Sequence, residues 1–64
     1  GPLNVHALNG TKITSLEVFD GTGRVVNQQG LAPSSLVNMD LTALASGPYF
    51  LRVNRNTTIK LRKE

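Results

Sequence analysis

The chain is predicted to fold as an all-β protein, a small antiparallel β-sandwich of about six or seven strands. Apolar and polar residues alternate with a period of two through almost the whole sequence, as they do in strands that bury one face. Turn signals recur between the alternating segments, among them Asn9-Gly10 and the run from Asp20 to Gly23. Short strands at this regular spacing indicate a sandwich rather than a βαβ fold.

The first predicted strand ends in a hairpin signal. Val5 and Ala7 lie on one face of this strand, and His6 and Leu8 lie on the other. Asn9-Gly10 then predicts a tight hairpin into the next strand, because both residues tolerate the positive φ of a type I′ turn.

The second strand lies within the segment KITSLEVFD. Leu16 and Val18 face one way, while Glu17 and Phe19 face the other. The segment from Asp20 to Gly23 is a turn in which the Asp20 carboxylate is expected to bond its own turn backbone. The segment RVVNQQ is the returning strand, and GLAPSS after it is predicted to be a loop that contains Pro33.

Alternation resumes in the second half of the chain. The segment LVNMDL is predicted to be a strand, and TALAS is compatible with one helical turn that Gly47-Pro48 would stop. Tyr49, Leu51 and Val53 then share the face of a strand that is expected to point into the core. After the turn NRNT, a last strand is expected to bury Ile59 and Leu61 and to expose its basic residues.

Length and composition limit the number of domains. The 64 residues suffice for one domain, with a stability of a few kcal/mol on the scale of such small chains (roughly 60% of the unfolded surface is buried). We interpret Gly1-Pro2 as the remnant of an expression tag and residues 3–64 as a single domain. The sequence contains no cysteine, so it has neither a disulfide framework nor a thiolate metal site. It also lacks the roughly 20-residue apolar run of a membrane helix and a recognisable signal peptide.

The residues argue against an enzyme and against a bound cofactor or metal. The single histidine, His6, would have to support nucleophilic catalysis without a Ser in a G-x-S-x-G setting. The four acidic residues are scattered, and none has the spacing of a metal-binding loop. The segment GTGR lacks the spacing of a phosphate-binding loop and precedes a strand, so its glycines are interpreted as turn residues.

Nucleic-acid binding is an alternative that the charge leaves open. The formal net charge is +3, and single-strand binders pair a basic groove with aromatic residues on which bases stack. The chain has three aromatic residues, of which Tyr49 is assigned to the core. Phe19 and Phe50 are candidates either for an exposed surface or for covering the second sheet.

Five of the seven basic residues lie from Arg52 onward. One interpretation is that Lys60, Arg62 and Lys63 are the solvated side of an edge strand and deter aggregation. The other is that a strand anchored by Ile59 and Leu61 holds these charges in place for a partner protein to recognise.

Three ordered motifs resemble the C-terminal sorting domain of the type IX secretion system. They are LEVFDGTGRVV, VNMDLTALASGPYFLRVN and the closing TIKLRKE, which together span Leu16 to Glu64. The residues that match the family motifs are Asp20, Gly23, Arg24, Asp40, Leu41, Leu44, Gly47, Tyr49, Leu51, Arg52, Val53 and Lys60 to Glu64. Met39 and Pro48 depart from the family pattern. Since proline cannot donate to a ladder, the strand should begin at Tyr49 or lie at a sheet edge there.

The resemblance implies an immunoglobulin-like sandwich that acts as an export address without catalysis. It implies a cargo protein that is exported through the periplasm to the outer-membrane surface or is secreted. It also implies contact with the outer-membrane shuttle and translocon, and with a sortase where the domain is cleaved. Small-molecule substrates and nucleic acid are not expected, and a homodimer through an edge strand is left open.

We predict a recognition surface made of one sheet face and the terminal tract. Its residues are Phe50, Arg52, Lys60, Leu61, Arg62, Lys63 and Glu64. An adhesion or spacer module with no sorting role is the alternative, because a fold alone does not specify function.

Overall fold

The computed structural model describes residues 2–7 and 10–64. This part of the chain forms six strands, with no helix among the described residues. The strands are β1 (Pro2–His6), β2 (Ile13–Asp20), β3 (Val25–Ser34), β4 (Leu36–Asp40), β5 (Gly47–Val53) and β6 (Thr57–Lys63). The predicted all-β class and strand number are therefore confirmed.

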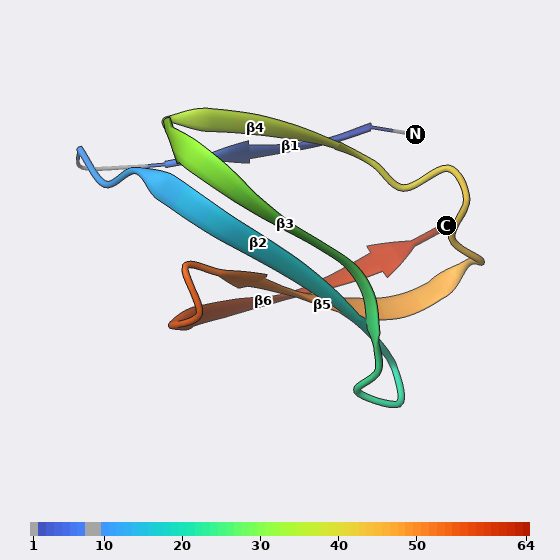
Figure 1. The fold of residues 1–64 in the computed structure, drawn as a ribbon. Coiled ribbons are helices and arrows are strands. Elements are labelled where there is room, and N and C mark those ends of the chain that lie inside the picture. The colour runs from blue at the N-terminus through green and yellow to red at the C-terminus, as the bar shows by residue number, and fades with distance from the viewer. Residues whose placement is uncertain (1, 8–9) are drawn as a thin grey trace.

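The strands form two antiparallel sheets, shown in Figure 1. The larger sheet has the order β3-β2-β5-β6, and the smaller sheet pairs β1 with β4. Strand β3 lies in the larger sheet and β4 in the smaller one, so the chain crosses between the sheets at Ser35. The Ser35 carbonyl accepts a hydrogen bond of 2.9 Å from the Ala7 amide, which holds the crossing against the end of β1.

The predicted hairpin between the first two strands is wrong. Strand β1 pairs with β4, with Val5 opposite Val37, while β2 pairs with β3 and β5. The first turn therefore connects two sheets instead of two neighbouring strands. Gly10 has a φ of 75°, but Leu8 and Asn9, which carry the rest of this prediction, lie outside the described residues.

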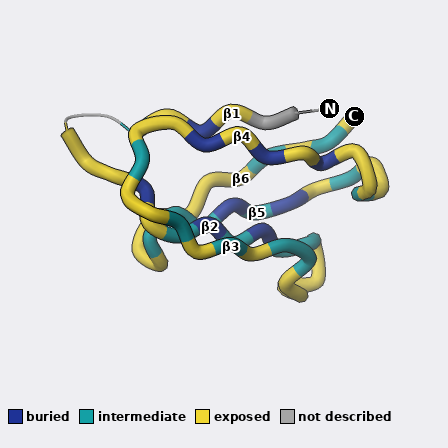
Figure 2. Tube along the Cα trace, turned by 45° about the horizontal axis from the view of Figure 1, so that its top comes forward, coloured by how far each residue is buried: buried dark blue, intermediate teal, exposed yellow. Residues whose placement is uncertain are grey.

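The buried residues come from both sheets and from the connection after β4, and they meet between the sheets (Figure 2). They are Val5, Ile13, Leu16, Val18, Val37, Met39, Leu41, Tyr49 and Leu51. The alternation of β2 and β5 is as predicted, because Leu16, Val18, Tyr49 and Leu51 are buried while Glu17, Phe19 and Phe50 are only half-buried. His6 is exposed and Val5 is buried, so the two lie on different faces of β1, as predicted.

The segment GLAPSS is not the predicted loop, because β3 continues through it to Ser34. Strand β3 is an edge strand, where the missing N–H of Pro33 is tolerated. The pairing with β2 is also irregular here: Ile13 is opposite Ser34, but Ser15 is opposite Gly30. This irregularity gives the proline room without ending the strand.

The segment TALAS forms a turn, in which the Leu44 amide donates to the Leu41 carbonyl at 3.0 Å, and it does not form a helical turn. Strand β5 begins at Gly47, so its predicted start at Tyr49 is wrong. The alternative, that Pro48 lies at an edge, is confirmed, because the pairing of β5 with β2 stops at Tyr49. Pro48 pairs with Arg62 of β6 alone and lies beside Gly21.

The predicted burial of the last strand is half right. Leu61 packs against the core, but the Ile59 side chain is 47% exposed. Strand β6 is at the edge of the larger sheet, where Ile59 lines an open cleft with Val5 and Ala7 instead of packing into the core.

Candidate functional site

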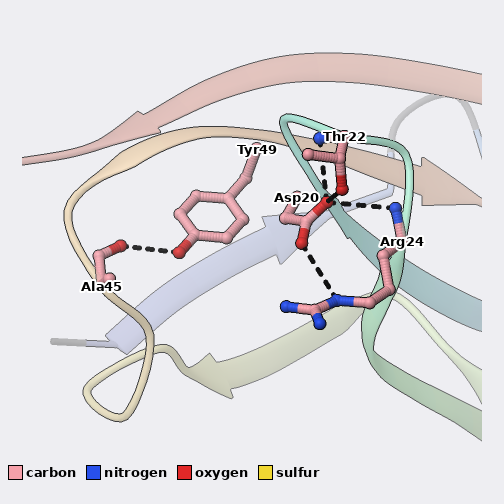
Figure 3. Close-up of polar contacts among 5 residues, drawn as sticks. All are labelled: Asp20, Thr22, Arg24, Ala45 and Tyr49. Carbon is pink, nitrogen blue, oxygen red and sulfur yellow. Dashed lines mark hydrogen bonds and ion pairs between the residues drawn. The ribbon is translucent and has the colours of Figure 1, made fainter.

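The first motif of the resemblance builds the turn between β2 and β3, as Figure 3 shows. Asp20 Oδ1 accepts hydrogen bonds from the Thr22 amide at 2.9 Å, the Thr22 hydroxyl at 2.6 Å and the Arg24 amide at 3.0 Å. The hydrogen bond from the Thr22 hydroxyl contributes most to lowering the pKa of Asp20 to about 2. The prediction that Asp20 bonds its own turn is confirmed, and Gly23 supplies a φ of 88° there.

Asp40 organises the turn after β4 in the same way. Its carboxylate accepts from the Thr42 amide at 2.9 Å and from the Thr42 hydroxyl. These bonds, with a smaller contribution from the charge of Lys63, hold the pKa of Asp40 below its usual value. The two motif aspartates therefore shape two connections by the same local chemistry, the Asp-x-Thr turn.

Tyr49 holds the start of β5 against the preceding connection. Its hydroxyl donates to the Ala45 carbonyl at 2.6 Å, as drawn in Figure 3, and its ring is buried. Buried tyrosines usually direct their hydroxyl to such a partner, because an unpaired buried donor is costly. Gly47, between these two residues, has a φ of 146°, which side chains with a Cβ rarely adopt.

Lys63 departs from the predicted solvated position. It lies on the same face of β6 as Leu61, and its Nζ donates to the carbonyls of Leu41 at 2.7 Å and Thr42 at 3.0 Å, and also to Leu44. Its ammonium therefore holds the end of β6 to the connection between β4 and β5. The alternation of the strand explains this, because Lys63 is two residues from Leu61 and so shares its inward face.

The other predicted cations lie on the outer face of the larger sheet. The register places Phe50 opposite Lys60, and Pro48 opposite Arg62. Lys60 and Arg62 are both exposed. Arg62 reaches Glu64 at 3.5 Å, but both side chains are largely in solvent, so the ion pair leaves the Arg62 charge available.

A second cluster of this face joins β2 to β5. Arg52 lies opposite Glu17 and bonds its carboxylate at 2.9 Å, and its guanidinium lies 5.1 Å from the centre of the Phe19 ring. Phe19 in turn lies opposite Phe50. Glu17 and Phe19 were predicted to face away from the core, but they were not among the predicted recognition residues. The feature that could have identified them is the pairing of an acidic with a basic residue and of two aromatic residues at facing positions. It can be recognised only once β2 and β5 are known to be neighbours.

The predicted recognition residues are therefore divided between two faces. The outer face carries Phe50, Arg52, Lys60 and Arg62, whereas Leu61 and Lys63 point inward and Glu64 is exposed after the strand. The turn motifs around Asp20, Asp40 and Tyr49 position the strands that carry this surface.

The described residues hold no group of three or more side chains suited to a metal ion. The same residues form no helix that is long and apolar enough to cross a membrane. Together, these features define a small all-β module whose ordered polar side chains shape turns and whose sheet presents aromatic and cationic groups.

The chain belongs to the family of secretion system C-terminal sorting domains, whose sequence profile matches residues 1–64. This confirms the resemblance to the type IX sorting signal. Membership implies interaction with the secretion machinery and a secreted or cell-surface protein. No curated protein and no solved structure gives a significant match to the chain.

Proposed function

We propose that this domain is a non-catalytic address that directs an attached cargo through the type IX outer-membrane translocon to the cell surface. The observation that supports this function most is that the basic C-terminal segment is held in a paired strand. Thr57 to Lys63 pair continuously with β5, and Lys63 at the end of β6 is hydrogen-bonded to the connection from Leu41 to Leu44. Lys60 and Arg62 are thus held at defined positions beside Phe50, where a protein partner can bind them.

The proposal assigns recognition to the outer face and assigns integrity to the inward residues. An exporter that binds folded cargo needs a rigid patch, and long cations on a paired strand lose less entropy on binding than those on a free tail. Phe50, Arg52, Lys60 and Arg62 form this patch in the proposal. Leu61 and Lys63 contribute by keeping β6 in place.

The test is to fuse the chain to an inert reporter that carries a signal for crossing the inner membrane. In a bacterium with a type IX system, we expect the reporter outside the cell, and in a strain without the translocon we expect it in the periplasm. An adhesion or spacer module would leave the reporter in the periplasm of both strains. That result would rule out a sorting function for the domain.

Two variants separate recognition from folding. Removing Lys60 to Glu64 is expected to retain the reporter in the periplasm, but it also removes Leu61 and Lys63 from the fold. Lys60→Ala together with Arg62→Ala changes exposed side chains alone, so we expect lost export with an unchanged unfolding transition. Normal export of this double variant would remove the outer face from the proposed recognition surface.

A further inference from the structure

The two edges of the larger sheet differ in how regular they are. At the β3 edge, the pairing with β2 is interrupted between Ile13 and Ser15 and again between Val18 and Phe19, and the strand contains Pro33. Interruptions and prolines are features that keep an edge from accepting another strand. Strand β6 pairs with β5 over all seven of its residues without an interruption, and it contains no proline. It is the edge that remains competent to pair.

The inner side of this edge adjoins a cleft whose lining combines five apolar residues with His6, Thr11, Asn54, Asn56 and Thr57. Ile59, which is 47% exposed, lines a cleft of about 450 Å³ together with Val5, Ala7, Ile13 and Val53. The cleft lies where β1 of the smaller sheet faces the hairpin of β5 and β6. A strand added along β6 would direct every second side chain toward this side. Apolar side chains there would cover Ile59 and the mouth of the cleft.

The outer side of the same edge is cationic. Lys60 forms no ion pair among the described residues, and Arg62 has only its exposed contact with Glu64. Side chains of an added strand that lie opposite Lys60 and Arg62 would be directly adjacent to them. Acidic residues at these places would be attracted, and basic ones repelled.

We infer that β6 binds an extended acidic segment of its partner as an additional antiparallel strand, with apolar and acidic residues alternating along that segment. The inference rests on the proposed function in assigning this segment to the export machinery. Main-chain hydrogen bonds supply affinity in such strand addition, and the alternating side chains supply specificity. Apolar residues face the Ile59 side, and carboxylates face Lys60 and Arg62.

A second copy of the chain fits this edge less well. Lys60 is the central residue of β6, so an antiparallel pair of β6 strands in full register places Lys60 opposite Lys60. Like charges in directly opposite positions destabilise a strand pair. Registers that avoid this contact leave part of each strand unpaired.

The inference can be tested on the isolated chain with a capped peptide, as long as β6, in which valine and glutamate alternate. Titration followed by amide NMR is expected to shift signals from Ile59 to Arg62 and to slow hydrogen exchange at β6 amides that face away from β5. Shifted signals at the β3 edge instead of β6 would overturn the inference. So would slow exchange of those β6 amides in the absence of peptide, because it would show that the chain pairs with itself.

Charge and backbone controls make the test specific. A peptide with lysine in place of glutamate is expected to bind about tenfold more weakly, which is about 1.4 kcal/mol, because like charges then face Lys60 and Arg62. A glutamate peptide methylated at alternate amide nitrogens on the pairing edge should not bind. The variant Lys60→Glu with Arg62→Glu should reverse the preference between the two charged peptides, a result that an unfolded variant cannot produce. Equal binding of both peptides to the wild-type chain would contradict the inference.

The cellular outcome distinguishes this inference from the proposed function. If the wild-type reporter fusion is exported and the charge-reversed variant is exported equally well, the inferred binding of an acidic strand is wrong and the proposed sorting function is retained. If the wild-type fusion itself is retained in the periplasm, the address fails, and the peptide titration alone decides whether β6 accepts an acidic strand.

Discussion

Lys63 and Lys60 show how the direction of one side chain changes the role of a cation. Lys63 Nζ donates to three main-chain carbonyls of the connection from Leu41 to Leu44, while Lys60 projects from the outer face of the same strand. A hydrogen bond from a charged donor stabilises a fold more than a neutral one, and its loss leaves carbonyls to be satisfied by water.

We expect Lys63→Met to lower the free energy of unfolding by about 1–3 kcal/mol, because the ammonium contacts are lost while most of the stem is kept. The matched variant Lys60→Met should change it by less than about 0.5 kcal/mol, as exposed substitutions usually do. Urea unfolding followed by circular dichroism measures both. Equal losses in the two variants would contradict the structural role of Lys63.

Asp20 gives the domain a defined response to acid. Its pKa is lowered from the ordinary value of 3.8 to about 2, first by the Thr22 hydroxyl and then by the Arg24 amide. A carboxylate with a depressed folded pKa stabilises the fold fully above its ordinary pKa, and this contribution disappears as the pH falls through the folded pKa. Thermal unfolding should therefore shift to lower temperature between about pH 4 and pH 2.

Asp40 contributes in the same direction, since its pKa is also below its usual value. In Asp20→Asn the loss of stability between pH 4 and pH 2 should be smaller than in the wild type, because one of the two carboxylates no longer titrates. Thermal unfolding scans at a series of pH values decide this. An acid response that Asp20→Asn leaves unchanged would exclude the turn carboxylate as its source.

At the scale of elements, the connections decide which strands meet. The crossing at Ser35 moves the chain from the larger sheet to the smaller one, which brings β4 to β1 instead of leaving it beside β3. Asn54 makes a further tie: its Oδ1 accepts from the Thr14 amide at 2.8 Å, and its Nδ2 donates to the Lys12 carbonyl at 2.9 Å. The hairpin of β5 and β6 is thereby fixed to the start of β2.

Gly47 is the glycine whose backbone matters most to β5. Its φ of 146° is in a region that is essentially restricted to glycine, so Gly47→Ala is expected to cost about 1–3 kcal/mol of unfolding free energy. Gly30→Ala is the matched control: a Cβ there meets no atom within 4 Å, and its φ is not positive. The control should be neutral or slightly stabilising. Denaturant unfolding compares the two, and a similar cost at both sites would show that backbone strain is not the cause.

At the scale of the whole molecule, one small core supports both sheets. Leu16 is completely buried at the centre of β2, whereas Ile59 is 47% exposed at the edge. Replacing a buried leucine with alanine costs about 2–5 kcal/mol, which is comparable to the total stability of a domain of this size. The proposed address acts as a folded unit, so loss of the core should abolish export.

We therefore expect Leu16→Ala to unfold a large fraction of the domain and to retain a reporter fusion in the periplasm. Ile59→Ala should unfold close to the wild-type temperature, since its side chain is half in solvent already. Thermal unfolding of the isolated chain and fractionation of cells with the fusion provide the two measurements. Efficient export of an unfolded Leu16→Ala domain would show that the machinery reads sequence rather than a folded surface.

Local pattern predicted much of this protein. Alternation placed Leu16, Val18, Tyr49 and Leu51 in the core, and the turn at Asp20 follows from side chains two to four residues away. These features depend on neighbours in the chain, and for that reason they can be derived without knowing the fold. The same local logic identified the family, because its motifs consist mainly of residues that make turns and core positions.

Tertiary structure decided what depends on distant partners. Val5 pairs with Val37 rather than across the first turn, and Pro33 is accommodated in an irregular edge strand. Ile59 stays exposed because it lines an open cleft at the edge of the larger sheet. Tertiary structure also divides the basic residues between two faces of β6. Lys63 lies on the inner face and finds carbonyl partners there, whereas Lys60 lies on the outer face in solvent. The amino-acid order determined which residues alternate, and the packing of two unequal sheets determined which of them remain available to a partner.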